Sequence, residues 1–106
     1  MNPKVKAIVV ELHQYLEGLY GERLNQTVVF GSQARGDSVE GSDIDILVIL
    51  KGPVRPSEEI ARTGEKTAGL SLKYNVVISC TFVSADRYET ERSPLLMNVR
   101  REGVTV

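Results

Sequence analysis

Residues 30–46 contain a short motif whose residue types could hold a phosphate group and a divalent cation side by side. Gly31 and Ser32 follow an apolar run, and Asp43 and Asp45 come after ten further residues. Because side chains alternate across a strand, the two aspartates would project from the same face, close enough to share one ion. The pattern predicts a site for a metal-bound nucleoside triphosphate.

The two aspartates need a partner, because like charges at the start of a buried strand repel each other and lose solvation. Residues 46–50 are all apolar, which favours an inner strand of a sheet. Mg²⁺ suits the pair, since it takes one or two protein carboxylates and completes its coordination with water and substrate phosphates. The alternative interpretation is that Asp43 and Asp45 only solvate the entry to the strand.

The phosphate half of the motif is a turn after a predicted strand at residues 27–30. Gly31 permits close approach of the backbone, and Ser32 could cap the following turn or donate its hydroxyl to a phosphate oxygen. Arg35 could reach the same anion through a bidentate guanidinium. An ordinary turn with a capping serine and a solvated arginine has the same composition, so the prediction depends on combining this turn with the two aspartates.

Residues 30–32, 34–36 and 42–45 together match the signature of the nucleotidyltransferase superfamily typified by DNA polymerase beta. The chain resembles in particular the short, stand-alone prokaryotic minimal nucleotidyltransferases, also in residues 75–79 and 98–104. This resemblance implies Mg²⁺-dependent transfer of a nucleoside monophosphate, with AMP from ATP expected, to a hydroxyl group. The predicted catalytic and metal-binding residues are Asp43 and Asp45. The predicted nucleotide-binding residues are Gly31, Ser32, Arg35 and Ser42.

The chain departs from the superfamily in one respect. Catalytic members carry a third carboxylate on a neighbouring strand, which completes a two-metal arrangement. Here that strand is predicted at residues 75–83, and Asn75 and Ser79 stand where the acid is expected. Asparagine can ligate through its carbonyl but cannot act as a base, and Asn75 could equally be a strand-entry residue that makes turn hydrogen bonds. Carboxylates that could fold back instead belong to Asp86, Glu89 and Glu102.

Composition is that of a small domain. The 106 residues predict one domain, 1–106, with a single core. The net charge of −1 gives no general attraction to nucleic acid or membranes, so nucleic acid is not an expected partner. The lone Cys80 excludes an intrachain disulfide and is typical of a reducing cytoplasm. No signal peptide or membrane-spanning run is evident, and the predicted location is cytoplasmic.

The elements around the motif predict an α+β fold (α/β two-layer), with a small mixed sheet covered by helices, as in polymerase-beta-like nucleotidyltransferases. A helix should begin at Asn2 and bury an apolar stripe that ends with Leu19. Strands are predicted at 26–31, 43–50 and 75–83, with a helix at 56–72 between the last two. Ser84 and Ser93 could cap two short helices, and residues 104–106 could form a last strand.

Three functions follow from these observations. The first is a minimal nucleotidyltransferase. The second is a regulatory or antitoxin subunit that binds a nucleoside triphosphate but catalyses weakly, because it lacks the third carboxylate. The third is a binding module with no nucleotide. Because the chain is too short to include an acceptor-binding domain, a partner is expected. The resemblance implies a helical HEPN-family protein in a toxin–antitoxin pair, and a homo-oligomer is the alternative.

Overall fold

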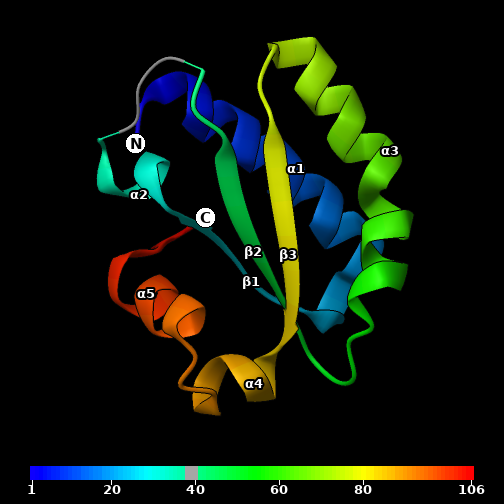
Figure 1. The fold of residues 1–106 in the computed structure, drawn as a ribbon. Helices are drawn as coiled ribbons and strands as arrows, with labels where there is room; N and C mark the ends of the chain where they lie inside the picture. Colours follow the sequence, from blue (N-terminus) through cyan, green and yellow to red (C-terminus); the bar gives the residue numbers. More distant parts are fainter. Residues whose placement is uncertain (38–40) are drawn as a thin grey trace.

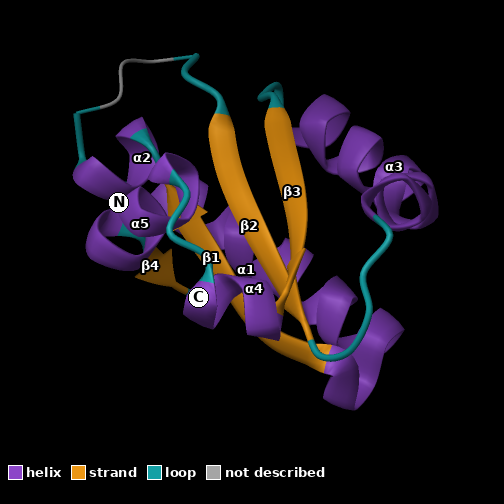
Figure 2. Cartoon of the chain, turned by 60° about the horizontal axis from the view of Figure 1, so that its bottom comes forward, coloured by secondary structure: helices purple, strands orange, loops and turns teal. Residues whose placement is uncertain are grey.

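A mixed β-sheet with helices on both faces organises the chain (Figures 1 and 2). The structure is a computed structural model that describes residues 1–37 and 41–106. Its strands are β1 (Leu24–Phe30), β2 (Ile44–Leu50), β3 (Ile78–Ser84) and β4 (Val104–Thr105). Its helices are α1 (Pro3–Tyr20), the 3₁₀ turn η1 (Gly21–Arg23), α2 (Ser32–Arg35), α3 (Pro56–Tyr74), α4 (Ala85–Thr90) and α5 (Pro94–Glu102). No helix in the described residues is long and apolar enough to cross a membrane.

The strand order β3-β2-β1-β4 places the motif strand β2 inside the sheet. β1 pairs with β2 and with β4 in antiparallel fashion, whereas β2 and β3 are parallel. The parallel pair requires a crossover, which α3 provides. The sheet is therefore mixed and the α+β class is confirmed.

The residues of β2 alternate between two cores, as the apolar run predicted. One core lies under α1 and α3, and β2 contributes Ile44, Ile46, Val48 and Leu50 to it. The other lies under α4 and α5, and β2 contributes Leu47 and Ile49 to it. All six side chains are fully buried. By alternation, Asp45 lies on the same face as Leu47 and Ile49, next to Leu47 at the end of the strand.

Helix α1 begins as the sequence predicted and ends with a different buried residue. The Oδ1 atom of Asn2 accepts a hydrogen bond from the Val5 amide at 2.8 Å, which caps the helix. Tyr20, rather than the expected Leu19, is the last buried residue, and Leu19 is exposed. The reason is a specific contact, since the Tyr20 hydroxyl donates to the buried carboxylate of Glu59 on α3 at 2.6 Å.

The third strand begins later than predicted, at Ile78 rather than at residue 75. Helix α3 continues to Tyr74, and Asn75 forms its C-cap with φ of 54°, in the left-handed region. The Asn75 amide donates to the Ser71 carbonyl, which completes the helix end. Asparagine tolerates this conformation better than most residues, so a helix cap takes the place of the expected strand entry.

Candidate functional site

The two aspartates lie at the start of β2, and only the second is within the strand. Asp45 is the second residue of β2, half-buried, and pairs with Phe30 on β1 and Ser79 on β3. Asp43 precedes the strand and is exposed. The Asp43 charge raises the pKa of Asp45, which places the two carboxylates within electrostatic reach of each other.

The two halves of the motif meet at Gly31. A Cβ atom added to this glycine would lie 2.7 Å from Oδ2 of Asp45, too close for any real contact. The φ angle of Gly31 is also 74°, with ψ at −154°, a conformation nearly restricted to glycine. The absence of a side chain at Gly31 therefore makes the space that the Asp45 carboxylate occupies.

A second contact joins the turn to the aspartates. Gln33, which is buried within α2, donates from Nε2 to the Ser42 carbonyl at 3.3 Å. Helix α2 is one turn long, and its first residue is Ser32. Residues 38–40, in the middle of the connecting loop, lie outside the described part of the chain. Gln33 was not predicted, because a polar residue in a turn gives no signal in the sequence.

Asp45 has an unusual electrostatic environment for a carboxyl group. Burial, and then the nearby charge of Asp43, raise its pKa above the usual range. Both causes penalise the ionised form, which is the form that binds a cation. A cation bound between the two carboxylates would offset this penalty. Without a cation, the ionised Asp45 carboxylate destabilises the folded chain.

Arg35, predicted to reach the phosphate, points to carboxylates in the structure. Its guanidinium lies 3.1 Å from Asp37 and 3.6 Å from Glu102 at the end of α5. The hydrogen bond to Asp37, and more weakly the contact with Glu102, raise the pKa of Arg35. Arg35 thus connects the motif turn to α5, and its role toward phosphate stays a prediction.

Ser79 lies directly beside Asp45 on the neighbouring parallel strand, and its side chain is exposed. Ser79 therefore stands where the third carboxylate of the superfamily is expected. Asn75, the other candidate for that place, forms the C-cap of α3 instead. Within residues 1–37 and 41–106, no group of three His, Cys, Asp or Glu side chains could hold a metal ion. Of the substitutes considered, Glu102 contacts Arg35, and the others lie on α4.

The donor set fits a hard cation that shares its coordination with a ligand. Two carboxylates, one partly desolvated and held against Gly31, offer oxygen atoms of the kind that Mg²⁺ binds. They supply too few ligands for a closed protein site. Water and phosphate oxygens would fill the remaining coordination positions of the cation. The turn at Ser32, where a phosphate is predicted to bind, is adjacent.

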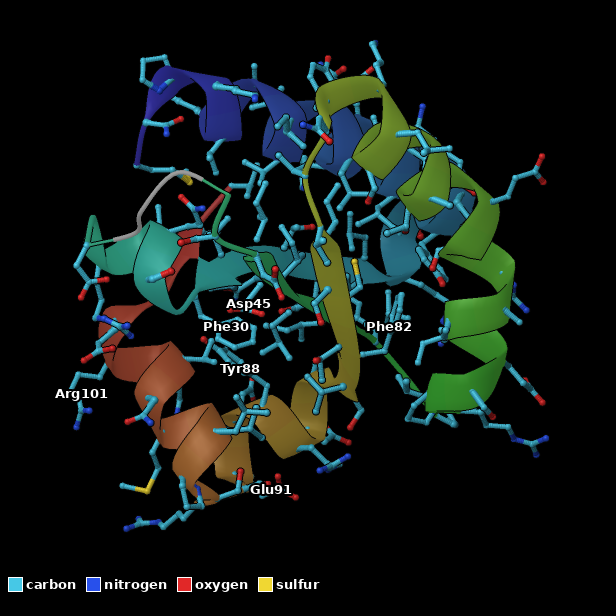
Figure 3. The ribbon with its side chains drawn as sticks, turned by 45° about the horizontal axis from the view of Figure 1, so that its top comes forward. Phe30, Asp45, Phe82, Tyr88, Glu91 and Arg101 are labelled. Carbon is cyan, nitrogen blue, oxygen red and sulfur yellow. The ribbon has the colours of Figure 1, made fainter. Side chains whose placement is uncertain are left out.

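The face of the sheet around Asp45 is partly covered. Phe30 packs at the edge of the core under α4 and α5, and Figure 3 shows Phe30 and Tyr88 on the same side of the molecule as Asp45. On β3, Ser79 and Thr81 remain exposed on this face. A ligand held at Asp45 would therefore have Phe30 and Tyr88 on one side and the exposed residues Ser79 and Thr81 of β3 on the other.

The chain matches a known protein family. A model of the family described as "Nucleotidyltransferase domain" matches residues 9–96. Two proteins of Methanocaldococcus jannaschii, each named "Putative protein adenylyltransferase", are similar to the chain. The first is 31% identical over 74 residues, covering 68% of this chain and 72% of the relative. The second is 36% identical over 96 residues, covering 90% of each.

A solved structure supports the fold. A toxin–antitoxin crystal structure with AMP-PNP aligns with a TM-score of 0.63 over 98% of this chain and 72% of the other, at 19% identity. At this identity the likeness concerns the fold alone. The mixed sheet with helices on both faces is therefore shared.

Proposed function

This chain belongs to the nucleotidyltransferase domain family, and we propose that it transfers AMP from ATP to a hydroxyl group of a protein acceptor. The names of the two M. jannaschii relatives support AMP as the transferred group and a protein as the acceptor. In the proposed site, Asp43 and Asp45 bind the metal and Gly31, Ser32, Arg35 and Ser42 bind the nucleotide. The nucleotide is ATP and the cation is Mg²⁺.

The observation that carries this proposal is the contact between the two halves of the motif. The Asp45 carboxylate occupies the space left by the missing side chain of Gly31, 2.7 Å from the place of a Cβ atom. A cation on Asp45 would therefore be held beside the turn that begins at Ser32. This is the juxtaposition that a metal-bound triphosphate requires.

In the proposed reaction the acceptor oxygen forms a bond to the α-phosphorus, and the bond from that phosphorus to the β-phosphate oxygen breaks. Pyrophosphate leaves, and the hydroxyl proton passes to solvent or to a base on the acceptor side. Mg²⁺, when bound, supplies neutralisation of phosphate charge. Gly31 and Ser32 position the triphosphate, and Asp43 and Asp45 hold negative charge at a fixed place. Positioning and charge neutralisation together would contribute most of the rate.

Transfer from ATP labelled at the α-phosphate tests this function, with soluble extract of the source cells as the pool of acceptors. We expect a labelled protein with the natural chain, and no label from ATP labelled at the γ-phosphate. Asp45→Asn should abolish the labelling. Asp86→Asn is the matched control and should retain it, because Asp86 is exposed on α4, which follows the end of β3 opposite to Ser79 and Asp45. Equal labelling by Asp45→Asn and the natural chain would contradict the proposal.

A second candidate function is a nucleotide-binding subunit with little turnover. Ser79 favours it, because this residue stands beside Asp45 where a third carboxylate would assist the acceptor hydroxyl. Under this alternative, the chain binds Mg²⁺–ATP and transfers AMP slowly or not at all. The transfer assay, run alongside a binding measurement, distinguishes the two functions.

The proposed acceptor is a separate polypeptide that also completes the site. Strand β3 is at the edge of the sheet, and its Ser79 and Thr81 are exposed on the face that carries Asp45. The similar solved structure is described as a toxin–antitoxin, and we extend that setting to this chain, with a helical HEPN-type protein as partner. Under this proposal the chain acts as the antitoxin.

A further inference from the structure

A hollow with a mainly cationic lining lies at the far end of β2 from the aspartates. Its volume is about 590 Å³, and its wall comes from η1, the segment after β2 and the first two turns of α3 (Figure 1). Its charged lining residues, which define the basic hollow, are Arg23, Lys51, Arg55, Glu58, Glu59 and Arg62. Asp45 is near the start of β2 and Lys51 follows its end, so about 20 Å of strand separates the two places.

The basic hollow carries excess positive charge. Four of its side chains are cationic and two are carboxylates, which gives a local charge of +2 in a chain of net charge −1. The carboxylates of Glu58 and Glu59 each pair with an arginine of the hollow. Among the described residues, Arg23 and Lys51 make no ion pair. Because like charges at one place repel each other, an anion in the hollow would be stabilising.

The charge of Arg23 is fixed in position but not neutralised. Its Nε atom donates to the carbonyl of Lys51 at 3.2 Å, and its Nη2 atom donates to the carbonyl of Pro53 at 2.9 Å. The guanidinium also lies 5.8 Å from the centre of the Tyr20 ring. None of these partners is an anion. A ligand would therefore meet a guanidinium whose side chain is already ordered, which lowers the entropic cost of binding.

A second guanidinium of the basic hollow is held by a buried carboxylate. Arg62 lies 3.2 Å from Oε1 of Glu59, and the Tyr20 hydroxyl donates to the same oxygen at 2.6 Å. Glu59 is only 4% exposed. Arg23 and Arg62 thus both attach to the pair of Tyr20 and Glu59, one at the ring and the other at the carboxylate. Two arginines are therefore positioned around one hollow by the same buried contact.

We propose that the basic hollow binds a small anion with two or more phosphate groups, at a site separate from Asp45. Guanidinium groups match the geometry of phosphate oxygens, and the Lys51 ammonium adds a mobile point charge. The volume falls within the range of roughly 300–1,000 Å³ that is usual for small-molecule sites. A nucleic-acid backbone would instead need cations along an extended row of phosphates, and these cations are gathered at one place.

Titration with inorganic pyrophosphate, without Mg²⁺ and at fixed ionic strength, tests this proposal in isotope-labelled protein. We expect a saturable shift of the backbone amide signal of Gly52, which lines the hollow, with a dissociation constant in the millimolar range or tighter. The amide signals of Gly31 and Ser32 report on the other site in the same spectra. No saturable shift at Gly52, or saturable shifts confined to Gly31 and Ser32, would overturn the proposal.

A double variant, Lys51→Gln with Arg55→Gln, tests the lining itself. Both side chains are exposed, so the fold does not depend on them, and we expect the dissociation constant to rise at least about tenfold. Lys4→Gln with Lys6→Gln is the matched control, because it removes the same charge from exposed positions on α1. The control should leave the constant unchanged. Equal weakening in the two double variants would show a general attraction of charge and would overturn the proposal.

Two further ligands test the chemical class. Citrate carries three carboxylates and no phosphate, and it should bind at Gly52 more weakly than pyrophosphate does; binding that is as tight would overturn the assignment to phosphate. ADP without Mg²⁺ should also bind there, and its affinity relative to pyrophosphate tells whether a nucleotide or a free polyphosphate is the better ligand. No shift of Gly52 with ADP would exclude a nucleotide as the source. Because no arm uses Mg²⁺ or transfer, the result is independent of the proposed function.

Discussion

At the scale of single residues, the proposed site depends on a glycine whose missing side chain leaves room for an aspartate. The sequence separated them by fourteen positions, and only the fold brings the Gly31 backbone against the Asp45 carboxylate. The sequence predicted that both belong to the site, because their types suit phosphate and metal. It did not predict that they touch, since the contact depends on the register of β1 against β2.

Gly31→Ala tests this contact. A methyl group at this position would displace Oδ2 of Asp45, and we expect transfer to fall about 10²-fold, the scale of a displacement of about 1 Å at a reacting centre. Gly21→Ala is the matched control, because Gly21 also has positive φ with ψ of −127° but meets nothing within 4 Å. Both variants should lose stability, and only Gly31→Ala should lose transfer. Equal transfer by the two would show that the contact is irrelevant to the reaction.

Asp45→Asn should make the fold more stable at neutral pH while removing metal-dependent binding. The raised pKa of Asp45 means that its ionised form destabilises the folded state. This penalty is fully present above the raised pKa of Asp45 in the folded chain, and it lessens as the pH falls through that pKa. Below the ordinary pKa of the unfolded chain, Asp45 is protonated in both states and the penalty is gone. The advantage of Asp45→Asn should therefore shrink on acidification. Thermal unfolding at pH 8 and below pH 4, without metal, measures it, and a variant that is less stable at pH 8 would contradict the assignment.

At the scale of elements, β3 is where sequence and structure differ most. Residues 75–83 alternate like a strand, but α3 continues to Tyr74 and Asn75 closes it in the left-handed conformation. Local periodicity could not decide where the helix would end, because that depends on how α3 packs on the sheet. The displacement leaves Ser79, and not Asn75, beside Asp45.

Ser79→Asp should therefore increase transfer if the missing carboxylate limits the reaction. The new acid would stand beside Asp45 and could help to activate the acceptor hydroxyl. We expect a rise of about tenfold or more, up to the roughly 10²–10⁴-fold effect of a well-positioned base. Thr81→Asp, two residues along the same exposed face, is the control and should have no such effect. If neither or both variants gain activity, the position beside Asp45 has no special role.

The docking of α3 on α1 depends on a polar contact that periodicity did not reveal. Tyr20 donates to Glu59, which is only 4% exposed and also lies 3.2 Å from Arg62. Tyr20→Phe should lower the free energy of unfolding by about 1–3 kcal/mol, because the buried Glu59 carboxylate loses its hydroxyl donor and keeps only Arg62.

Tyr74→Phe is the matched comparison for that variant. Tyr74 also donates to a carboxylate that keeps a cationic partner, that of Glu11 with Lys73, but the Glu11 side chain is much more exposed than that of Glu59. The loss of stability in urea unfolding should be clearly smaller. A larger loss for Tyr74→Phe than for Tyr20→Phe would show that burial does not govern these two contacts.

At the scale of the whole molecule, the sequence predicted the class of fold because its signals are local. The apolar run of β2, the Asn2 cap and the serine caps of α4 and α5 each predict one element, and the structure confirms them. Contacts between distant residues could not be predicted in this way. Arg35 with Glu102 is one example, because the position of α5 relative to α2 depends on β4 pairing with β1.

Calorimetric titration of ATP, with and without Mg²⁺, is the measurement that tests the proposed triphosphate site most directly. Into the natural chain we expect binding that requires Mg²⁺, and into Asp45→Asn we expect none under the same conditions. Asp86→Asn should bind as the natural chain does. Binding that is equally strong in Asp45→Asn, or no binding to the natural chain at millimolar Mg²⁺–ATP, would contradict the assignment of this turn and these aspartates to a metal-bound nucleotide.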